Sequence, residues 1–225
     1  MKVRRIIQGL LFTFCLMLTA ETTRADVFSV SVNTTAISGG SFFVNFQLTN
    51  SNAANNNILI NNFNFGGGSA GAPATIQLTG GAAGSLNAGA VTLTDGGGQF
   101  LNEFIQGFTP GSVLSFNLDV SGNFSGGTPD AFSFAIFQDD GSGNPGAEIP
   151  TFGPGDSFVF INLRQPLVPQ CNSSDPSRTN INIPTPNCTS TMAPIPEPTT
   201  LLLLGTGLAG VATRARKRRK ARVSE

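Results

Sequence analysis

The sequence predicts an all-β protein organised around a single antiparallel β-sandwich. Short segments in which apolar and polar residues alternate recur from residue 27 to residue 163, and Gly-, Asn- and Asp-rich turns separate them. Such period-two alternation is typical of strands with one buried face. Strong helix-forming runs are scarce, and no repeat of about 20–50 residues is visible. These observations favour a sandwich, and a jelly roll is one form that it could take.

Eight segments have the pattern of strands. In chain order they are 27–34, 41–50, 58–65, 74–80, 90–95, 112–120, 131–138 and 156–163. Between the fifth and sixth segments lies "FLNEFIQGF", residues 100–108, in which Phe100, Phe104 and Phe108 are spaced four apart. That spacing places side chains on one face of a helix. We therefore expect a short helix or an irregular segment there.

The composition excludes several classes of function. The chain has 225 residues with 19 Phe but no His, Trp or Tyr. Without His, nucleophile–His arrangements and His-ligated metals are excluded. From residue 26 to residue 193 there are ten acidic residues and two arginines, a net charge of about −8, whereas nucleic-acid binding requires clustered basic residues. We expect a non-enzymatic protein with no catalytic, cofactor or metal residues and no nucleic-acid partner.

Two sharper possibilities have weak support. A carboxylate pair could in principle hydrolyse glycosides, but the few acids mostly adjoin Gly, Asn or Pro in turns. Asp139 and Asp140, in "DDGSGNPG", could form a calcium loop, although the spacing of known calcium loops is absent. A solvated turn is the better interpretation of this pair.

The N-terminus has the order of a secretory signal peptide. A basic "MKVRR" precedes the apolar "IIQGLLFTFCLML", and Thr23 and Ala25 supply small residues before Asp26. We therefore predict export through the Sec translocon, with cleavage of residues 1–25 between Ala25 and Asp26. A buried N-terminal helix is the less favoured alternative.

Export gives a role to the two remaining cysteines, Cys171 and Cys188. An oxidising compartment favours a disulfide between them. A zinc site is improbable with two cysteines and no His. The surrounding segment, 166–194, is rich in Pro, Asn, Ser and Thr and predicts a disordered, extended linker.

The C-terminal region combines three features. Pro196-Glu197-Pro198 is followed by fifteen mostly apolar residues, 199–213, and then by a tail with seven basic residues. A helix of that length covers about 22 Å, against about 30 Å of membrane hydrocarbon. Proline restricts its own backbone and that of the preceding residue, so the Pro-Glu-Pro strip is extended. The run can halt translocation with its basic tail in the cytoplasm, but it makes a poor permanent anchor. An ordinary tail anchor is the plain alternative.

In this order and position, the three features resemble the PEP-CTERM sorting signal of Gram-negative bacteria that make exopolysaccharide. The resemblance implies recognition of Pro196, Glu197 and Pro198 by an exosortase, a membrane cysteine protease of transpeptidase type, and removal of the hydrophobic run with its tail. Residue 195 is Ile where Val is common. A eukaryotic glycolipid-anchor signal is also removable, but it would not normally end in so many basic residues.

The chain thus divides into a signal peptide (1–25), a sandwich (26–165), a linker (166–194) and a sorting signal (195–225) whose transmembrane helix is transient. "GFTPGSVLSFNLDVSG" and "GDSFVFINL" also resemble PEP-CTERM surface proteins of unassigned biochemistry. We expect an inner-membrane precursor and then a cell-surface or matrix protein among exopolysaccharide. A carbohydrate-binding module is the alternative, favoured if Phe residues are exposed in a concave patch; a secreted hydrolase is the weakest hypothesis.

Overall fold

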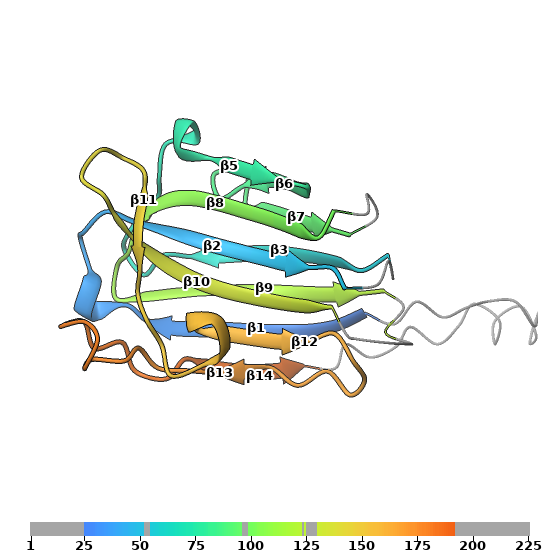
Figure 1. Cartoon of the computed structure of the whole chain (residues 1–225). Helices are drawn as coiled ribbons and strands as arrows, with labels where there is room; N and C mark the ends of the chain where they lie inside the picture. The colour runs from blue at the N-terminus through green and yellow to red at the C-terminus, as the bar shows by residue number, and fades with distance from the viewer. Residues whose placement is uncertain (1–24, 52–54, 96–98, 123, 125–129, 192–225) are drawn as a thin grey trace, which may run out of the picture. The chain divides into compact units, whose positions relative to one another are not determined.

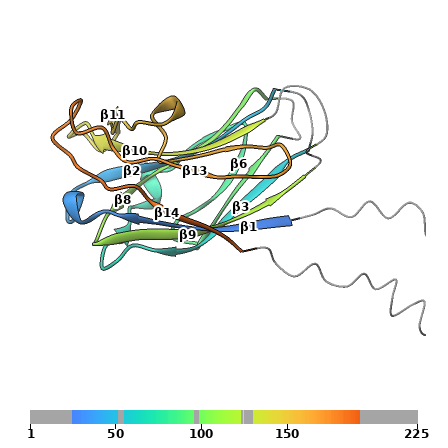
Figure 2. The same cartoon turned by 90° about the horizontal axis from the view of Figure 1, so that it is seen from below.

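In the computed structural model, the structure describes residues 25–51, 55–95, 99–122, 124 and 130–191. They belong to one compact unit made of two antiparallel sheets that stack face to face (Figures 1 and 2). The described residues contain no α-helix, only the three 3-10 turns η2 (Thr35–Ile37), η3 (Pro73–Thr75) and η4 (Pro154–Asp156). The predicted all-β sandwich is confirmed.

The first sheet, sheet A, has six strands. Its order is β14 (Asn187–Thr191), β1 (Ala25–Asn33), β9 (Val113–Ser121), β3 (Asn57–Asn64), β7 (Ala90–Thr94) and β6 (Gly81–Ser85). Sheet B has the order β13 (Gln170–Cys171), β12 (Val159–Asn162), β10 (Ala131–Asp139), β2 (Phe42–Thr49), β8 (Leu101–Thr109) and β4 (Ser69–Ala70). Two short strands complete sheet B, because β11 (Pro145–Glu148) pairs with β10 and β5 (Gln77–Thr79) pairs with β8.

The chain crosses between the sheets from β1 to β2, from β2 to β3 and again from β7 through β8 and β9 to β10, so the central neighbours in each sheet are distant in the sequence. β1 pairs with β9 over nine positions, from Ala25 opposite Ser121 to Asn33 opposite Val113. β2 pairs with β10 on one side and with β8 on the other. Crossing connections of this kind are found in Greek-key sandwiches. Each of the eight predicted strand segments overlaps one of the observed strands.

The core lies between the inner faces of the two sheets and is dominated by phenylalanine. Phe46, from the middle of β2, is completely buried. Its ring lies 5.1–6.4 Å, centroid to centroid, from the rings of five other residues: Phe63, Phe104, Phe116, Phe132 and Phe134. Tilted, offset and edge-on contacts at these distances add to the burial of each ring. The alternating Phe positions of the sequence are therefore the centre of the fold.

The prediction of a helix or irregular segment at 100–108 is wrong, because this segment forms strand β8. Phe104 and Phe108 are buried in the core, and residues four apart share a face in a strand as well as in a helix. The inward positions between and before them are the buried amides Asn102 and Gln106. Polar residues on the inner face interrupt the apolar alternation by which a strand is recognised in a sequence.

The buried amides are satisfied by specific partners. Gln106 accepts a hydrogen bond from Leu86 N at 2.8 Å and donates to Asn87 Oδ1 at 2.6 Å. Asn102 Oδ1 accepts from Gly81 N at 2.6 Å, beside the turn at Gly80 that connects β5 with β6. Gly80 has a φ of +64°, and a Cβ there would collide with the Asn102 side chain. Buried amides with partners of this kind specify the position of the chain and carry little desolvation penalty.

The prediction of a disordered, extended linker at 166–194 is also wrong for the part that the structure describes. Its described part, up to residue 191, packs on the sandwich: β13 pairs with β12, and β14 pairs with β1 from Val27 opposite Thr191 to Ser31 opposite Asn187. Ile183 is completely buried, and its N–H donates to Ser174 Oγ at 2.6 Å. Backbone pairing can hold a polar, Pro-rich segment in place, and the composition gives no sign of that pairing. The sandwich domain therefore extends to residue 191.

The two sheets are connected at both lateral edges of the sandwich. At one edge the chain passes from β5 in sheet B to β6 in sheet A, and at the other edge β13 and β14 lie in opposite sheets (Figure 1). Within the described ranges, no helix has the length and apolar character needed to cross a membrane. The predicted membrane segment and the signal peptide up to residue 24 lie outside those ranges.

Candidate functional site

The predicted signal-peptide cleavage site lies at the start of β1. Ala25 is exposed, whereas Asp26 is 8% exposed and accepts a hydrogen bond from Gln165 Nε2 at 3.1 Å. Asp26 also lies opposite Val120 in the β1–β9 ladder. Strand β1 therefore begins one residue before the expected start of the mature chain. Cleavage between Ala25 and Asp26 remains a prediction.

Cys171 and Cys188 are joined, as predicted. Cys171 in β13 forms a disulfide with Cys188 in β14, with their Cα atoms 6.3 Å apart. Because β13 belongs to sheet B and β14 to sheet A, the disulfide connects the two sheets at one edge of the sandwich. Its place explains how the Pro-rich segment between the cysteines is held against the domain.

The Asp139–Asp140 turn has the geometry of a solvated turn. Asp139 Oδ1 accepts hydrogen bonds from Gly141 N at 2.8 Å and from Gly143 N at 3.1 Å, and its Oδ2 accepts from Ser41 Oγ at 2.7 Å. Asp140 Oδ1 accepts from the N–H groups of Ser142 and Asn144. These donors lower the pKa of Asp139 below its ordinary value, the Ser41 hydroxyl having the largest effect. Carboxylates already bound by N–H and O–H donors offer few lone pairs to a cation, which supports the turn interpretation.

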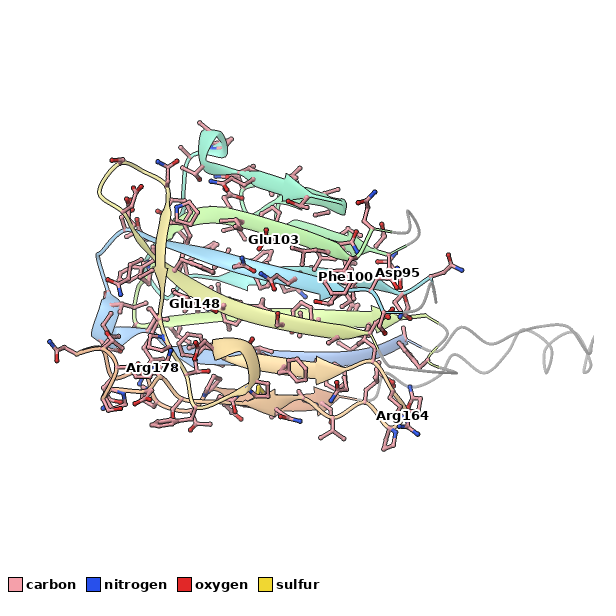
Figure 3. All side chains as sticks on the ribbon, in the orientation of Figure 1. Asp95, Phe100, Glu103, Glu148, Arg164 and Arg178 are labelled. Atoms are coloured by element: carbon pink, nitrogen blue, oxygen red, sulfur yellow. A yellow bond between two sulfur atoms is a disulfide. The ribbon has the colours of Figure 1, made fainter. Side chains whose placement is uncertain are left out.

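A polar cluster lies on the outer face of sheet B. Asn45 Nδ2 and Gln47 Nε2, from β2, both donate to Glu103 Oε1, each at 2.7 Å (Glu103 is labelled in Figure 3). The two amides hold the carboxylate of β8 in one position as a hydrogen-bond acceptor. Catalysis by paired carboxylates would need a second acid in a complementary role. This cluster is therefore a rigid, partly buried polar feature. The sequence did not reveal it, because Glu103 lies in the segment predicted as a helix.

A second acidic residue, Glu148, has an unusual environment. Partial burial of its side chain is the main cause that raises its pKa from 4.5 to about 7, and the nearby negative charge of Asp156 adds to the shift. Arg178 opposes the shift but is already paired with Asp156, at 2.7 Å and 3.1 Å from its two carboxylate oxygens. That pairing lowers the pKa of Asp156. Glu148 and Arg178 are labelled in Figure 3. No local sequence signal identifies Glu148, because its partners come from other segments.

The outer face of sheet A has an open depression of about 360 Å³. Its lining comes from β1, β9 and the segment leading into β14, and consists of Ser31, Asn33, Thr35, Ser112, Val113, Thr185 and Asn187. Hydroxyl and amide groups predominate there, and none of these residues is charged. Such groups can exchange hydrogen bonds with a neutral, hydroxyl-rich ligand.

Exposed phenylalanine rings do not line this depression. Among the described residues, Phe100 is 70% and Phe152 is 68% exposed. Phe100 immediately precedes β8, and Phe152 lies between β11 and η4. An aromatic surface for stacking on sugar rings, the condition set for a carbohydrate-binding module, is therefore not formed by these two residues at the depression.

Comparison with known proteins identifies the C-terminal region. A family model described as the PEP-CTERM protein-sorting motif matches residues 194–219. The chain carries a PEP-CTERM sorting motif. This motif implies export across the membrane to the cell surface and processing by an exosortase. No curated protein and no solved structure matches the chain.

The predicted recognition residues Pro196, Glu197 and Pro198 lie inside the matched range and outside the residues that the structure describes. The PEP-CTERM motif begins three positions after Thr191, the last residue of β14. The complete sandwich therefore precedes the motif in the chain.

Proposed function

We propose that this chain is a non-enzymatic protein of the cell surface or extracellular matrix, delivered by an exosortase and retained among exopolysaccharide. The observation that supports this most is the position of the sorting motif, which begins at residue 194, directly after the strand that completes the sandwich. Cleavage in or after the motif would release an intact domain. The signal peptide and the Sec translocon would supply the first step of this route.

The surface of the domain suits a hydrated, neutral polymer. Strand β1 presents Ser29 and Ser31 on its outer face, and Ser29 Oγ donates to Asn117 Oδ1 of β9 at 3.0 Å. With ten acids and two arginines from residue 26 to residue 193, the domain would repel an acidic polysaccharide over the range of unscreened charges. The absence of His from the whole sequence supports a role without acid–base catalysis by imidazole.

The sorting step is tested by replacing Glu197 with alanine in a strain that carries an exosortase. If the motif is recognised, Glu197→Ala should leave a full-length precursor in the inner membrane. The wild-type protein should lose about 3 kDa, the mass of a tail of this size in a 23.3 kDa chain of 225 residues. Glu225→Ala is the matched control, since it removes the same carboxylate from the same tail outside the motif, and it should be processed normally. A wild-type surface protein that retains Glu225 contradicts the proposal.

The matrix role needs a separate measurement. We expect the processed protein to remain with the exopolysaccharide fraction when cells are washed in buffer, and to appear in the medium when the polysaccharide is absent. Equal recovery in the matrix fraction with and without the polysaccharide would contradict retention by the polymer while leaving the sorting result unaffected.

The depression on sheet A favours carbohydrate binding as a second candidate function. Replacing Asn33 and Asn187 with alanine would remove two amides from its lining. If the depression binds a neutral glycan, binding on a glycan array should be lost in this double variant. It should be kept when the exposed Phe100, which is not among the lining residues, is changed to alanine. An array on which the wild-type protein binds no glycan would leave the matrix protein without a specific glycan site as the better proposal.

A further inference from the structure

Two buried carboxylates meet at one end of the sandwich. Asp95 directly follows β7 of sheet A, and Asp130 directly precedes β10 of sheet B. Their side chains are 1% and 3% exposed, and they lie close enough for the charge of Asp130 to act on Asp95. Asp95 is labelled in Figure 3, near Phe100. Two ionised carboxylates in contact repel each other, so a pair like this needs a shared proton or a cation.

Asp130 is held in place by hydrogen-bond donors. Its Oδ1 accepts from Ser51 N at 2.8 Å and from Ser51 Oγ at 3.1 Å, and its Oδ2 accepts from Asn56 Nδ2 at 2.7 Å. Such donors favour the charged form of a carboxylate. Ser51 follows β2 and Asn56 precedes β3, so the carboxylate connects segments that belong to both sheets. Asp130 is therefore a fixed negative charge inside the domain.

Asp95 has the opposite environment. Neither Oδ1 nor Oδ2 has a hydrogen-bond partner, although both atoms are buried, and Asn56 Oδ1 is likewise without a partner. Burial, above all, and the side chain and negative charge of the neighbouring Asp130 raise the pKa of Asp95. Backbone N–H groups of Asn56 and of Asp95 itself favour the charged form, from positions that do not make a well-formed hydrogen bond. A buried polar atom without a partner is rare and requires an explanation.

The contrast with Asp139 shows what is unusual about Asp95. Three donors occupy the Asp139 carboxylate in an exposed turn, whereas the buried Asp95 has none. We considered Asp139 as a calcium ligand from the sequence, although hydrogen-bond donors already occupy its carboxylate. Asp95, whose two carboxylate oxygens have no hydrogen-bond partner, follows β7, and its neighbours come from the segments after β2, before β3 and before β10.

We propose that Asp95 and Asp130 form a binding site for a hard divalent cation of the calcium type. Asp95 would supply the bare carboxylate oxygens, and Asp130 would supply a positioned negative charge. Hard cations prefer carboxylate and amide oxygens, and calcium accepts irregular sets of them completed by water. Among the described residues no group of three or more His, Cys, Asp or Glu gathers around one point, so the protein contributes two carboxylates.

The number of charged ligands, two carboxylates, sets the expected dissociation constant for calcium. Calcium sites with few charged ligands have dissociation constants of about 10⁻⁴–10⁻³ M, the range of extracellular modules. A bound cation would also connect the ends of four segments, after β2, before β3, after β7 and before β10, and so join the two sheets at this end. We therefore expect a cation that stabilises the domain.

Differential scanning calorimetry of the processed protein tests the site at pH 7.5. Thermal unfolding is compared in 5 mM CaCl₂, in 5 mM MgCl₂ and in EDTA, with NaCl added to equal ionic strength. At a calcium concentration about ten times the dissociation constant, the unfolding equilibrium constant falls about tenfold, which raises Tm by about 3–5 °C for a domain of this size. Titration calorimetry should show one calcium ion bound per chain.

Two variants locate the effect. Asp95→Asn replaces the bare carboxylate with an amide that can donate to Asp130, so it should fold in EDTA and lose the calcium-dependent rise in Tm. Asp140→Asn removes an acid from the exposed turn and should keep the full rise. A wild-type Tm that is the same in calcium and in EDTA overturns the proposal, and so does a calcium response that persists in Asp95→Asn. The proposal is also overturned if calcium has no effect and a stabilisation at lower pH persists in Glu148→Gln but is lost in Asp95→Asn, because the two carboxylates then share a proton instead.

Discussion

The raised pKa of Glu148 predicts that the stability of the domain depends on pH near neutrality. In the folded protein this carboxyl group binds its proton more tightly than in the unfolded chain, because its pKa rises from 4.5 to about 7. Its contribution to stability is therefore complete below about pH 4.5 and is lost as the pH rises through about 7. Glu148→Gln removes this dependence, because glutamine resembles the protonated acid and does not ionise.

The magnitude follows from the size of the shift. A difference of about 2.5 between the two pKa values corresponds to an upper limit of about 3 kcal/mol. The side chain is only partly buried, and water screens the charges of Asp156 and Arg178 around it, so about 1–2 kcal/mol is a realistic expectation. The free energy of unfolding of Glu148→Gln should equal that of the wild type near pH 4.5. It should exceed the wild-type value by that amount at pH 8.

Urea unfolding followed by circular dichroism at pH 4.5, 6, 7 and 8 measures this difference directly. Subtracting the wild-type free energy from that of the variant at each pH removes the effects of acids common to both proteins. Asp140→Asn, in an exposed turn, is the control and should follow the wild type at every pH. A difference between Glu148→Gln and the wild type that stays constant from pH 4.5 to pH 8 would refute the assignment of the titration to Glu148.

Three further predictions concern the core, the disulfide and the N-terminus. Phe46→Ala removes the ring at the centre of the phenylalanine cluster and should cost about 3–5 kcal/mol of unfolding free energy, whereas Phe100→Ala, at a 70% exposed ring, should change it by less than about 0.5 kcal/mol in denaturant titrations. Cys188→Ser opens a disulfide that spans 17 positions and should cost about 3 kcal/mol by the chain-entropy argument; an unchanged midpoint would show that backbone pairing alone holds β14. N-terminal sequencing of the exported protein should begin at Asp26, and a sequence that begins earlier would contradict the predicted cleavage site.

Several of the strands that the sequence predicted correctly have two faces that differ in polarity. In β9, Leu114, Phe116 and Leu118 are buried, and Ser115 and Asn117 between them are partly exposed, so the alternation is visible in the sequence. In β8 the inner face mixes phenylalanine with buried amides, and the alternation disappears. The edge strand β14, "NCTST", has Cys188 as its one apolar residue and therefore shows no apolar alternation. Its position depends on hydrogen bonds to β1 and on a disulfide, which single-sequence patterns do not reveal.

The candidate sites also divide into one that the sequence reveals and others that only the fold reveals. The sorting motif is a linear signal, so Pro196, Glu197 and Pro198 could be recognised without any knowledge of the fold. The environments of Asp95 and Glu148 arise from residues brought together by strand crossing, and their unusual properties depend on burial and on missing or displaced partners. A sequence shows where the carboxylates are in the chain. It does not show how many hydrogen-bond donors surround each of them after folding.

The covalent link between β13 and β14 has a mechanical consequence. A pull on the chain from its C-terminal side enters the domain at Thr191 and would first peel β14 away from β1. After three residues the peeling reaches Cys188, where the bond to Cys171 transfers the load to β13 and so to sheet B. Further extension would then require both sheets to yield together, because the force no longer acts on one edge strand. The disulfide thus turns a strand that could be unzipped one hydrogen bond at a time into a tether that loads the whole sandwich.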